Sequence, residues 1–513
     1  MPLGILQLLA ILERDHPQIK FQFYDQNAFR IDNILDNKTE GLDEILQSED
    51  FDVIAIGGLI TAYTSIKLTL KKIKQIQPHA KIIAGGGFYS AIPYDMMEFL
   101  LELDYGCVGE AYLTLPELLN AIDKNEDPSH VKGIFYRKDG IIKFSEPREL
   151  IPEMDWLPFP AYKYAPLDIY FKNSGIIMSE ESLKSKKRLD AVMSLSCPFL
   201  CRFCWDLGVT SNTKMTLVDG KPEPVTGRPG KNSVVRHHSA KYFADYVEHM
   251  RKDFLDVPID DEGNGIGYPV DFVACMDENL VAHNAQTKFT WLNDVKDELW
   301  KRDLIADCVK NGVPHDPKTC NGPHYGGTSH AGLINEKTLK TFQDMGFTYL
   351  DYGLEHWDNK ILKNLGKGAT AEANKRAMQL HINTGIQPVP NQIIMFPDES
   401  WDSLNTMLDA WEETGIVTSP FICTPYPGSE WYIKYKDFIV EQYGGKLESF
   451  INDLEDATKI TALLTRKFTP SEAVGIQKIM SQASISGDFD NARRLLAISK
   501  KMKESGIIEH KTS

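Results

Sequence analysis

Residues 194–205 read Ser-Leu-Ser-Cys-Pro-Phe-Leu-Cys-Arg-Phe-Cys-Trp and place Cys197, Cys201 and Cys204 within eight residues. Three thiolates this close together can hold three irons of a cubane iron–sulfur cluster and leave the fourth iron open to a small molecule. A zinc site is the alternative, but a closed zinc site needs a fourth cysteine or histidine. The next histidines, His237 and His238, lie more than 30 residues further on. The spacing therefore favours the cluster.

The chain that surrounds these cysteines alternates short apolar runs with helical periodicity. Strands are expected at residues 191–195, 270–275, 348–353, 389–395 and 416–423, and helices at 240–253, 289–302, 336–345 and 371–384. Strands that alternate with helices form parallel sheets wound in right-handed units. We therefore predict a parallel partial (β/α) barrel of the TIM type, with its chemistry at the carboxyl ends of the strands.

The first 125 residues show the same alternation, with glycines at the strand ends. Strands are expected at residues 20–24, 52–56, 81–84 and 105–108, and helices at 61–76, 94–103 and 113–122. The glycines that follow these strands are Gly57, Gly58, Gly85, Gly86 and Gly109. Open α/β sheets bind ligands at this end of their strands, although one glycine alone is also ordinary turn chemistry. The pattern predicts a doubly wound parallel (Rossmann-like) domain with a ligand crevice.

The predicted organisation has four parts. They are an α/β domain over residues 1–130, a linker over 131–187 that contains a hairpin at 133–144, the barrel over 188–440 and a helical region over 441–513. Long polar insertions at 206–231, 256–268 and 310–326 interrupt the barrel, and we expect at least one to cover its mouth.

Composition excludes several classes of protein. The net charge of −16 argues against a nucleic-acid surface or binding to acidic membranes. The first 15 residues lack a signal-peptide cleavage site and fit a buried amphipathic helix instead. No apolar run is long enough to span a bilayer. Eight cysteines, three of them grouped, suit a metal site in a reducing cytoplasm.

The cysteine motif, with Phe203 before its last cysteine, is similar to that of the radical S-adenosylmethionine (radical SAM) superfamily. Four later segments support the resemblance: Asp277-Glu-Asn279, Tyr352-Gly-Leu-Glu355, Ile393-Ile-Met-Phe-Pro397 and Thr424-Pro-Tyr-Pro-Gly428. The resemblance implies a [4Fe-4S] cluster whose open iron binds S-adenosylmethionine, with a reductant such as flavodoxin or ferredoxin and cleavage to a 5′-deoxyadenosyl radical. The residues implied in binding S-adenosylmethionine are Phe203, Asp277, Glu278, Glu355 and Phe396.

The first domain resembles the cobalamin-binding domain that precedes many radical SAM barrels. The residues implied in binding cobalamin are Gly57, Gly58, Gly85, Gly86, Gly109 and Glu110. In two respects the chain departs from the pattern. The run Asp25-Gln-Asn-Ala-Phe-Arg30 has Asn27 where other members have an axial histidine, and no strand precedes the helix expected from Pro2, which suggests a truncated start.

The expected reaction is methylation of an unactivated carbon in a small-molecule or natural-product substrate. Two alternatives remain: a radical coupling, cyclisation or rearrangement without cobalamin, and a non-catalytic metal-binding module. A second metal site is also conceivable, with Cys308, Cys320 and either His315 or His324 as ligands.

Overall fold

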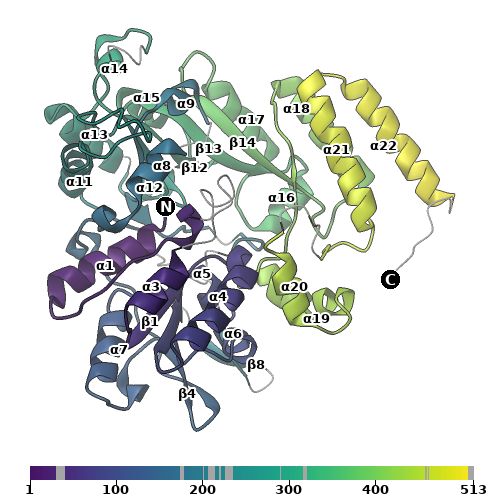
Figure 1. Ribbon diagram of the computed structural model, residues 1–513. Helices are drawn as coiled ribbons and strands as arrows, with labels where there is room; N and C mark the ends of the chain where they lie inside the picture. The colour runs from purple at the N-terminus through teal and green to yellow at the C-terminus, as the bar shows by residue number, and fades with distance from the viewer. Residues whose placement is uncertain are drawn as a thin grey trace.

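Two α/β units make up most of the molecule, and helices of the C-terminal region lie at one side of them (Figure 1). The computed structural model describes residues 1–29, 41–173, 178–199, 201–205, 214–218, 221–225, 235–288, 290–315, 320–456, 459 and 462–505. The α/β class predicted from the sequence is confirmed.

The N-terminal unit is built on a five-stranded sheet of order β1-β2-β3-β4-β5. Its parallel strands are β1 (Val53–Gly57), β2 (Lys81–Gly85) and β3 (Tyr105–Cys107). Its helices are α3 (Leu42–Ser48), α4 (Tyr63–Ile76), α5 (Gly87–Ser90), α6 (Pro93–Phe99) and α7 (Thr114–Asp123). These elements match the predicted strand–helix alternation.

Two features of this unit differ from expectation. The predicted hairpin, β4 (Ile134–Lys138) and β5 (Ile141–Phe144), is not part of a linker but extends the sheet, because β4 pairs antiparallel with β3. Residues 20–24 form no strand. Their alternation reflects Phe21 and Phe23, whose side chains pack against the core, and alternation alone does not supply a partner strand.

The predicted N-terminal helix is present as α1 (Leu3–Asp15). Leu6, Ile11 and Leu12 on this helix are buried. Leu6 packs into the core of the barrel unit and Leu12 into that of the N-terminal sheet. The helix therefore bridges the two units (Figure 1).

The second unit is a six-stranded, wholly parallel sheet of order β15-β14-β13-β12-β11-β6, which is the predicted partial barrel. Its strands are β6 (Arg188–Ala191), β11 (Phe272–Cys275), β12 (His324–Ser329), β13 (Phe347–Glu355), β14 (Gln387–Ile394) and β15 (Phe421–Ile422). Strand β12 was not predicted, and β15 is much shorter than the predicted strand at 416–423.

Helices cover the outside of this sheet. They are α11 (Ala240–Asp253), α12 (Leu280–Gln286), α13 (Trp291–Lys301), α14 (Asp307–Asn311), α15 (Glu336–Asp344), α16 (Asn359–Leu365), α17 (Ala371–Leu380) and α18 (Trp401–Thr414). Side chains of Ser239, Asn335, Asp358, Thr370 and Ser400 cap the first free N–H groups of α11, α15, α16, α17 and α18. The sequence thus fixes where these helices begin.

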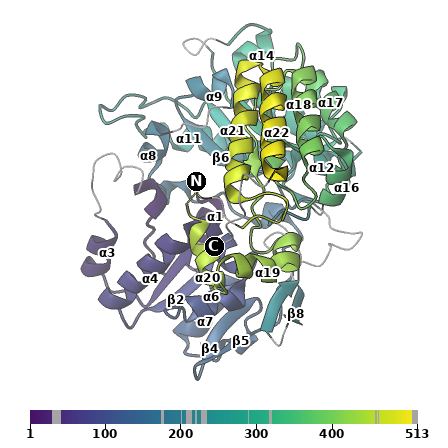
Figure 2. The same ribbon diagram turned by 90° about the vertical axis from the view of Figure 1, so that its right-hand side faces the viewer.

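Not all of the three polar insertions lie at the mouth of the barrel, where a lid would have to lie. Segment 256–268 and the described residues of 310–326 run into β11 and β12, so they lie at the amino ends of these strands, opposite the predicted mouth. Most of 206–231 falls outside the described residues. Its described part is the hairpin β8 (Lys214–Val218) and β9 (Lys221–Val225), which runs beside α6 of the N-terminal unit (Figure 2).

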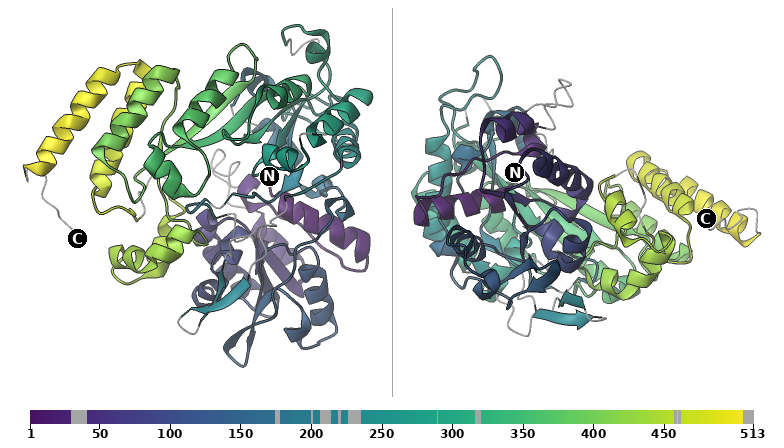
Figure 3. Two further views of the ribbon diagram at one scale, coloured as in Figure 1. Left: turned by 180° about the vertical axis from the view of Figure 1, so that it is seen from behind. Right: turned by 60° about the horizontal axis from the view of Figure 1, so that its bottom comes forward.

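The C-terminal region is helical, as predicted. Helices α21 (Pro470–Ser486) and α22 (Phe489–Glu504) stack on α18, while α19 (Glu430–Gln442) and α20 (Leu447–Asp453) lie beside the N-terminal unit (Figure 3). Tyr63 of α4 donates a 2.8 Å hydrogen bond to Glu448. Among the described residues, none of these helices is long and apolar enough to cross a bilayer.

Candidate active site

The cysteine loop follows the two-residue strand β7 (Ser194–Leu195), which pairs antiparallel with β10 (Arg236–His237). Backbone contacts hold the loop from two sides. Arg202 N donates to Leu365 O at 2.9 Å, and Arg202 O accepts from Trp431 N at 2.9 Å. Cys204 N also donates to Cys201 O at 3.0 Å. The loop is therefore fixed by the ends of α16 and α19 before any metal binds.

Two of the three thiols, those of Cys197 and Cys201, lie close to a buried cation. Burial raises the pKa of Cys197, and it raises the pKa of Cys201 to about 12. Burial alone would lower the pKa of Lys367, but the charges of Glu355 and of the Cys201 and Cys197 thiolates raise it overall. Iron binds thiolates and displaces their protons. A donor set of three sulfurs beside a permanent positive charge fits a cluster that carries negative charge.

Lys367 is paired with the predicted site residue Glu355. The Nζ atom of Lys367 donates to Oε1 of Glu355 and to the carbonyl of Gly353. Glu355 ends β13 with a φ of +61°, an uncommon conformation for a residue other than glycine. A Cβ atom on Gly353 would lie 2.2 Å from the Glu355 carboxylate. Only glycine therefore leaves room for this ion pair, and strained backbone of this kind often marks a functional site.

The acidic segment after β11 reaches the same loop. Oδ2 of Asp277 accepts from Met193 N at 3.0 Å, and Oδ1 accepts from Ser194 Oγ at 2.6 Å. Burial raises the pKa of Asp277 to about 6. Oε2 of Glu278 accepts from Ser196 N at 3.1 Å, next to the first cysteine. Asp277 thus positions the strand that leads into the loop, and Glu278 lies nearer to the thiols.

Two predicted aromatic residues lie together in a packed cluster. The ring centroids of Phe203 and Phe396 are 5.9 Å apart, and that of Phe396 lies 5.6 Å from the ring of Trp431. Only 1% of Phe396 is exposed. This packing fixes the last part of the cysteine loop, and the Phe396 side chain does not face open space.

Two residues of the site were missed at the level of sequence. The ring of His330, after β12, stacks on Phe199 of the cysteine loop with centroids 4.0 Å apart. Burial lowers the pKa of His330 to about 4, so the ring is neutral. His330 follows a strand that was not predicted and gave no signal. Lys367 lies in the Lys363–Gly368 segment, where its spacing from Glu355 was the available signal.

The glycine-bearing strand ends of the N-terminal sheet meet this loop. Gly86 has a φ of +79°, and a Cβ atom there would lie 3.1 Å from Gly58 O, so two chain segments approach closely. A Cβ atom on Gly87 would lie 2.6 Å from the ring of Trp205, the residue after the third cysteine. The predicted crevice and the cysteine loop are therefore in direct contact.

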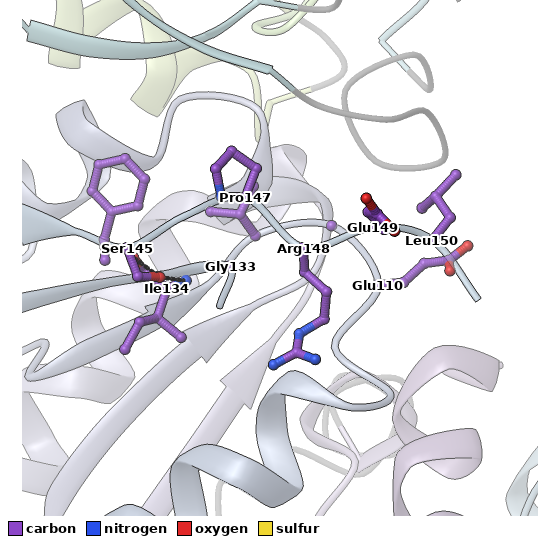
Figure 4. Close-up of a pocket in the computed structure, with 11 residues that line it drawn as sticks. Glu110, Gly133, Ile134, Ser145, Pro147, Arg148, Glu149 and Leu150 are labelled. Atoms are coloured by element: carbon purple, nitrogen blue, oxygen red, sulfur yellow. Dashed lines mark hydrogen bonds between the residues drawn. The ribbon is translucent and has the colours of Figure 1, made fainter. Parts of the chain in front are cut away.

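A buried ion pair joins the same two regions. Nη1 of Arg236, on β10, donates to Oε2 of Glu110 at 2.9 Å and to Ile151 O at 3.1 Å. Glu110 and Gly109 also line a small pocket at the end of β3, together with Arg148 and Glu149 (Figure 4). The Glu110 carboxylate is thus paired within the protein.

The residues predicted to contact cobalamin all end or follow β1, β2 or β3 and so share one edge of the sheet. All but Glu110 are glycines, which expose backbone atoms and let a large planar cofactor approach closely. Asp25 does not serve as a partner for a histidine. Its Oδ1 accepts from Asn27 N at 3.1 Å and Ala28 N at 3.2 Å. Position 27 carries asparagine, so the chain offers no imidazole to cobalt there.

Comparisons with known proteins agree with this arrangement. The model of the B12 binding domain matches residues 1–119, and that of the radical SAM superfamily matches residues 296–410. An uncharacterised methyltransferase of Pyrococcus horikoshii is 22% identical over 433 residues, which cover 83% of this chain and 77% of that protein.

Solved structures show the same fold. The radical S-adenosylmethionine methyltransferase TsrM from Kitasatospora setae, with cobalamin and a [4Fe-4S] cluster bound, superimposes with a TM-score of 0.58 and 15% identity. The match covers 86% of this chain and 72% of TsrM. The cobalamin-dependent S-adenosylmethionine radical enzyme OxsB gives 0.56 and 18%, over 85% of this chain and 53% of OxsB. The chain therefore contains a segment similar to the B12 binding domain and, after it, a segment similar to the radical SAM superfamily.

Proposed function

We propose that this protein is a cobalamin-dependent radical SAM methyltransferase that methylates an unactivated carbon of a small-molecule or natural-product substrate. The observation that carries the proposal is the contact between the two predicted cofactor regions. Trp205, directly after Cys204, lies against Gly87 at the end of β2. The Glu110–Arg236 pair links the end of β3 to the strand beside the cysteine loop.

The chain's own residues hold and orient the reactants. Cys197, Cys201 and Cys204 bind the cluster, while Lys367 offsets its charge. Glu278 and Glu355 lie beside the cysteines at the carboxyl ends of β11 and β13, where they can accept hydrogen bonds from the amino group of S-adenosylmethionine. Phe203 and Phe396, whose rings pack together, support the cysteine loop at the same place, and Asp277 acts through the loop it positions. When bound, the cluster supplies the electron that cleaves S-adenosylmethionine, and cobalamin carries the methyl group.

In the N-terminal unit, Gly57, Gly58, Gly85, Gly86 and Gly109 let the cofactor approach the strand ends. Glu110 acts there by fixing the strand end through Arg236. We also propose a cytoplasmic location and reduction by a flavodoxin or ferredoxin, in keeping with the reduced thiols that the cluster requires.

Product analysis tests the proposal. The anaerobically reconstituted protein, with cobalamin, is incubated with a reductant, a metabolite extract and S-adenosylmethionine that carries a deuterated methyl group. Methyl transfer to a substrate carbon radical consumes S-adenosylmethionine in two ways, as the source of the radical and as the methyl donor, so 5′-deoxyadenosine, S-adenosylhomocysteine and a deuterated product should form together. The variant with all three cluster cysteines changed to alanine should form no 5′-deoxyadenosine but should still bind hydroxocobalamin.

Each alternative predicts a different result. Formation of 5′-deoxyadenosine and a product without S-adenosylhomocysteine would identify a radical coupling, cyclisation or rearrangement. A protein with zinc at the three cysteines and no cleavage of S-adenosylmethionine would be a binding module. Either outcome would overturn the methyltransferase assignment.

A further inference from the structure

Four metal-ligating side chains meet at the base of the barrel, away from the three cluster cysteines. They are Cys308 on α14, His315 and Cys320 in the connection that follows, and His324, the first residue of β12. One ligand atom from each lies within 4.8 Å of all the others. The spacing is Cys-x6-His-x4-Cys-x3-His. We call this group the Cys2His2 site.

The distances between these atoms match the edges of a coordination tetrahedron. Nε2 of His324 lies 3.1 Å from Nδ1 of His315 and 3.5 Å from Sγ of Cys308, and Sγ of Cys308 lies 3.7 Å from Nδ1 of His315. Tetrahedral zinc with bonds of about 2.0 Å to nitrogen and 2.3 Å to sulfur would place two nitrogens about 3.3 Å apart and a nitrogen and a sulfur about 3.6 Å apart. The side chains are thus already arranged around one point.

The local fold brings the ligands together. Asp307 N donates to Asn321 O at 2.7 Å, and Ala306 N donates to Pro323 O at 3.2 Å, so the two ligand-bearing segments run side by side. Gly322 has a φ of +87°, and a Cβ atom there would lie 2.4 Å from Ile305 O. A glycine is therefore required for the close approach that sets Cys320 beside Cys308.

The chemical state of the side chains also suits a metal. Thiolate sulfurs and imidazole nitrogens are the ligands that zinc takes at structural sites. The N–H group of Cys308 donates to Sγ of Cys320 at 3.3 Å, a bond that orients this sulfur. Both Cys308 and His324 are 5% exposed. Two thiolates and a divalent cation have no net charge, which makes such burial favourable.

We propose that the Cys2His2 site binds one Zn²⁺ ion with a structural role. Four protein ligands leave no open position for a substrate. A two-iron cluster of mixed ligation carries its cysteines on one iron and its histidines on the other, whereas here all four ligand atoms lie within 4.8 Å of one another and surround a single point. The site lies at the amino end of β12, and the six residues of that strand separate it by about 20 Å from the carboxyl end, where His330 meets the cysteine loop. The ion therefore ties α14 to a central strand of the barrel and takes no part in the proposed reaction.

Metal analysis of the holoprotein, purified anaerobically from cells supplied with zinc and iron, tests this proposal. Elemental analysis should find about one zinc in addition to about four irons per chain. X-ray absorption at the zinc edge should show two sulfur and two nitrogen ligands at about 2.3 and 2.0 Å. His315→Ala and Cys308→Ser should each lower the zinc content at least tenfold and leave the iron content unchanged. His315 is half-buried, so its variant is the one expected to keep the fold.

Two controls separate this site from the cluster. Cys107→Ala removes another buried thiol and should change neither metal, and the triple alanine variant of the cluster cysteines should lose iron but keep zinc. Wild-type protein without zinc, a disulfide between Cys308 and Cys320, or zinc content that persists in both His315→Ala and Cys308→Ser would overturn the proposal. Because the readouts are metal content and ligation, they do not depend on methyl transfer.

Discussion

At the scale of single residues, Lys367 is the side chain on which the charge of the cysteine site depends. It is 8% exposed and lies between the Glu355 carboxylate and the thiols of Cys201 and Cys197. A buried charge is stable only with a partner. The charge of Lys367 is therefore balanced by Glu355 when no metal is bound. A bound cluster, which carries negative charge, would balance it further.

Removal of this charge should affect both stability and cluster binding. Lys367→Met leaves Glu355 buried without its partner, and loss of one member of a buried pair costs about 3–5 kcal/mol. We expect a lower unfolding midpoint in urea and less iron after anaerobic reconstitution. Lys363→Met, on the exposed face of α16, is the matched control and should change neither. An unfolding midpoint for Lys367→Met equal to that of the control would contradict this role.

At the scale of elements, the short ribbon of β7 and β10 is held by the residues that follow it. His238 N donates to Met193 O at 2.9 Å, just before β7. The His238 ring stacks on Tyr242 of α11 with centroids 3.9 Å apart, and its Nδ1 atom lies 3.2 Å from Oδ1 of Asp155. The start of α11 thereby positions the strand that leads into the cysteines.

The burial of His238 makes the stability of the β7–β10 ribbon depend on pH. Burial lowers the pKa of His238 to about 4, whereas an unfolded histidine has a pKa of about 6.5. The unfolded state therefore takes up a proton first, and the stabilisation is complete above pH 6.5 and is lost as the pH falls toward 4. At pH 5 the loss is on the order of 2 kcal/mol.

Unfolding in urea at pH 7, 6 and 5 measures this loss. The wild-type protein should lose more stability with falling pH than His238→Gln, which cannot take up the proton. His249→Gln, a partly exposed ring on the same helix, should keep the wild-type slope. Equal slopes for the wild type and His238→Gln would refute the assignment.

The same scale shows what the sequence could and could not predict. Helix α11 has the predicted bounds, because Ser239 caps its start and its apolar face repeats regularly. Strand β12 was missed because Gly326 and Gly327 carry no pattern. A Cβ atom at Gly326 would lie 2.1 Å from the Tyr349 ring. Position 326 is therefore glycine because it must leave room for the side chain of a residue far along the sequence. Tertiary contacts of this kind have no local signal.

For the candidate site too, some features could be predicted from the sequence and others could not. The cysteines were predicted from their spacing, and the strand-end carboxylates Glu278 and Glu355 from the resemblance of their segments to those of the radical SAM superfamily; the structure places both carboxylates near the cysteine loop. The partners of Asp277 and Glu110 could not be predicted, because Ser194 and Arg236 lie 83 and 126 residues away. Likewise, the four ligands of the Cys2His2 site span only 17 residues, yet their meeting depends on β12, an element without a sequence signal.

At the scale of the whole molecule, the two α/β units are joined beside the proposed reaction space. Helix α1 packs into both cores, and α20 contacts α4. The Glu110–Arg236 pair also crosses this junction, with both side chains less than a tenth exposed. Cofactors held by different units can react only if the units keep a fixed separation, and a buried pair between them enforces it.

Arg236→Met should therefore uncouple the units. It leaves Glu110 buried and unpaired, at a cost of about 3–5 kcal/mol, and we expect one unfolding transition to split into two. The double variant E110Q/R236M removes both charges and should recover at least 1 kcal/mol of this loss, a coupling typical of residues in contact. Arg148→Met is the matched control, because its partner Glu117 lies in the same unit and is half exposed; it should cost about 1 kcal/mol or less and keep one transition. If the single and double variants lose equal stability and neither splits the transition, the pair does not couple the units, and the fixed separation has to come from the contacts of α1 and α20.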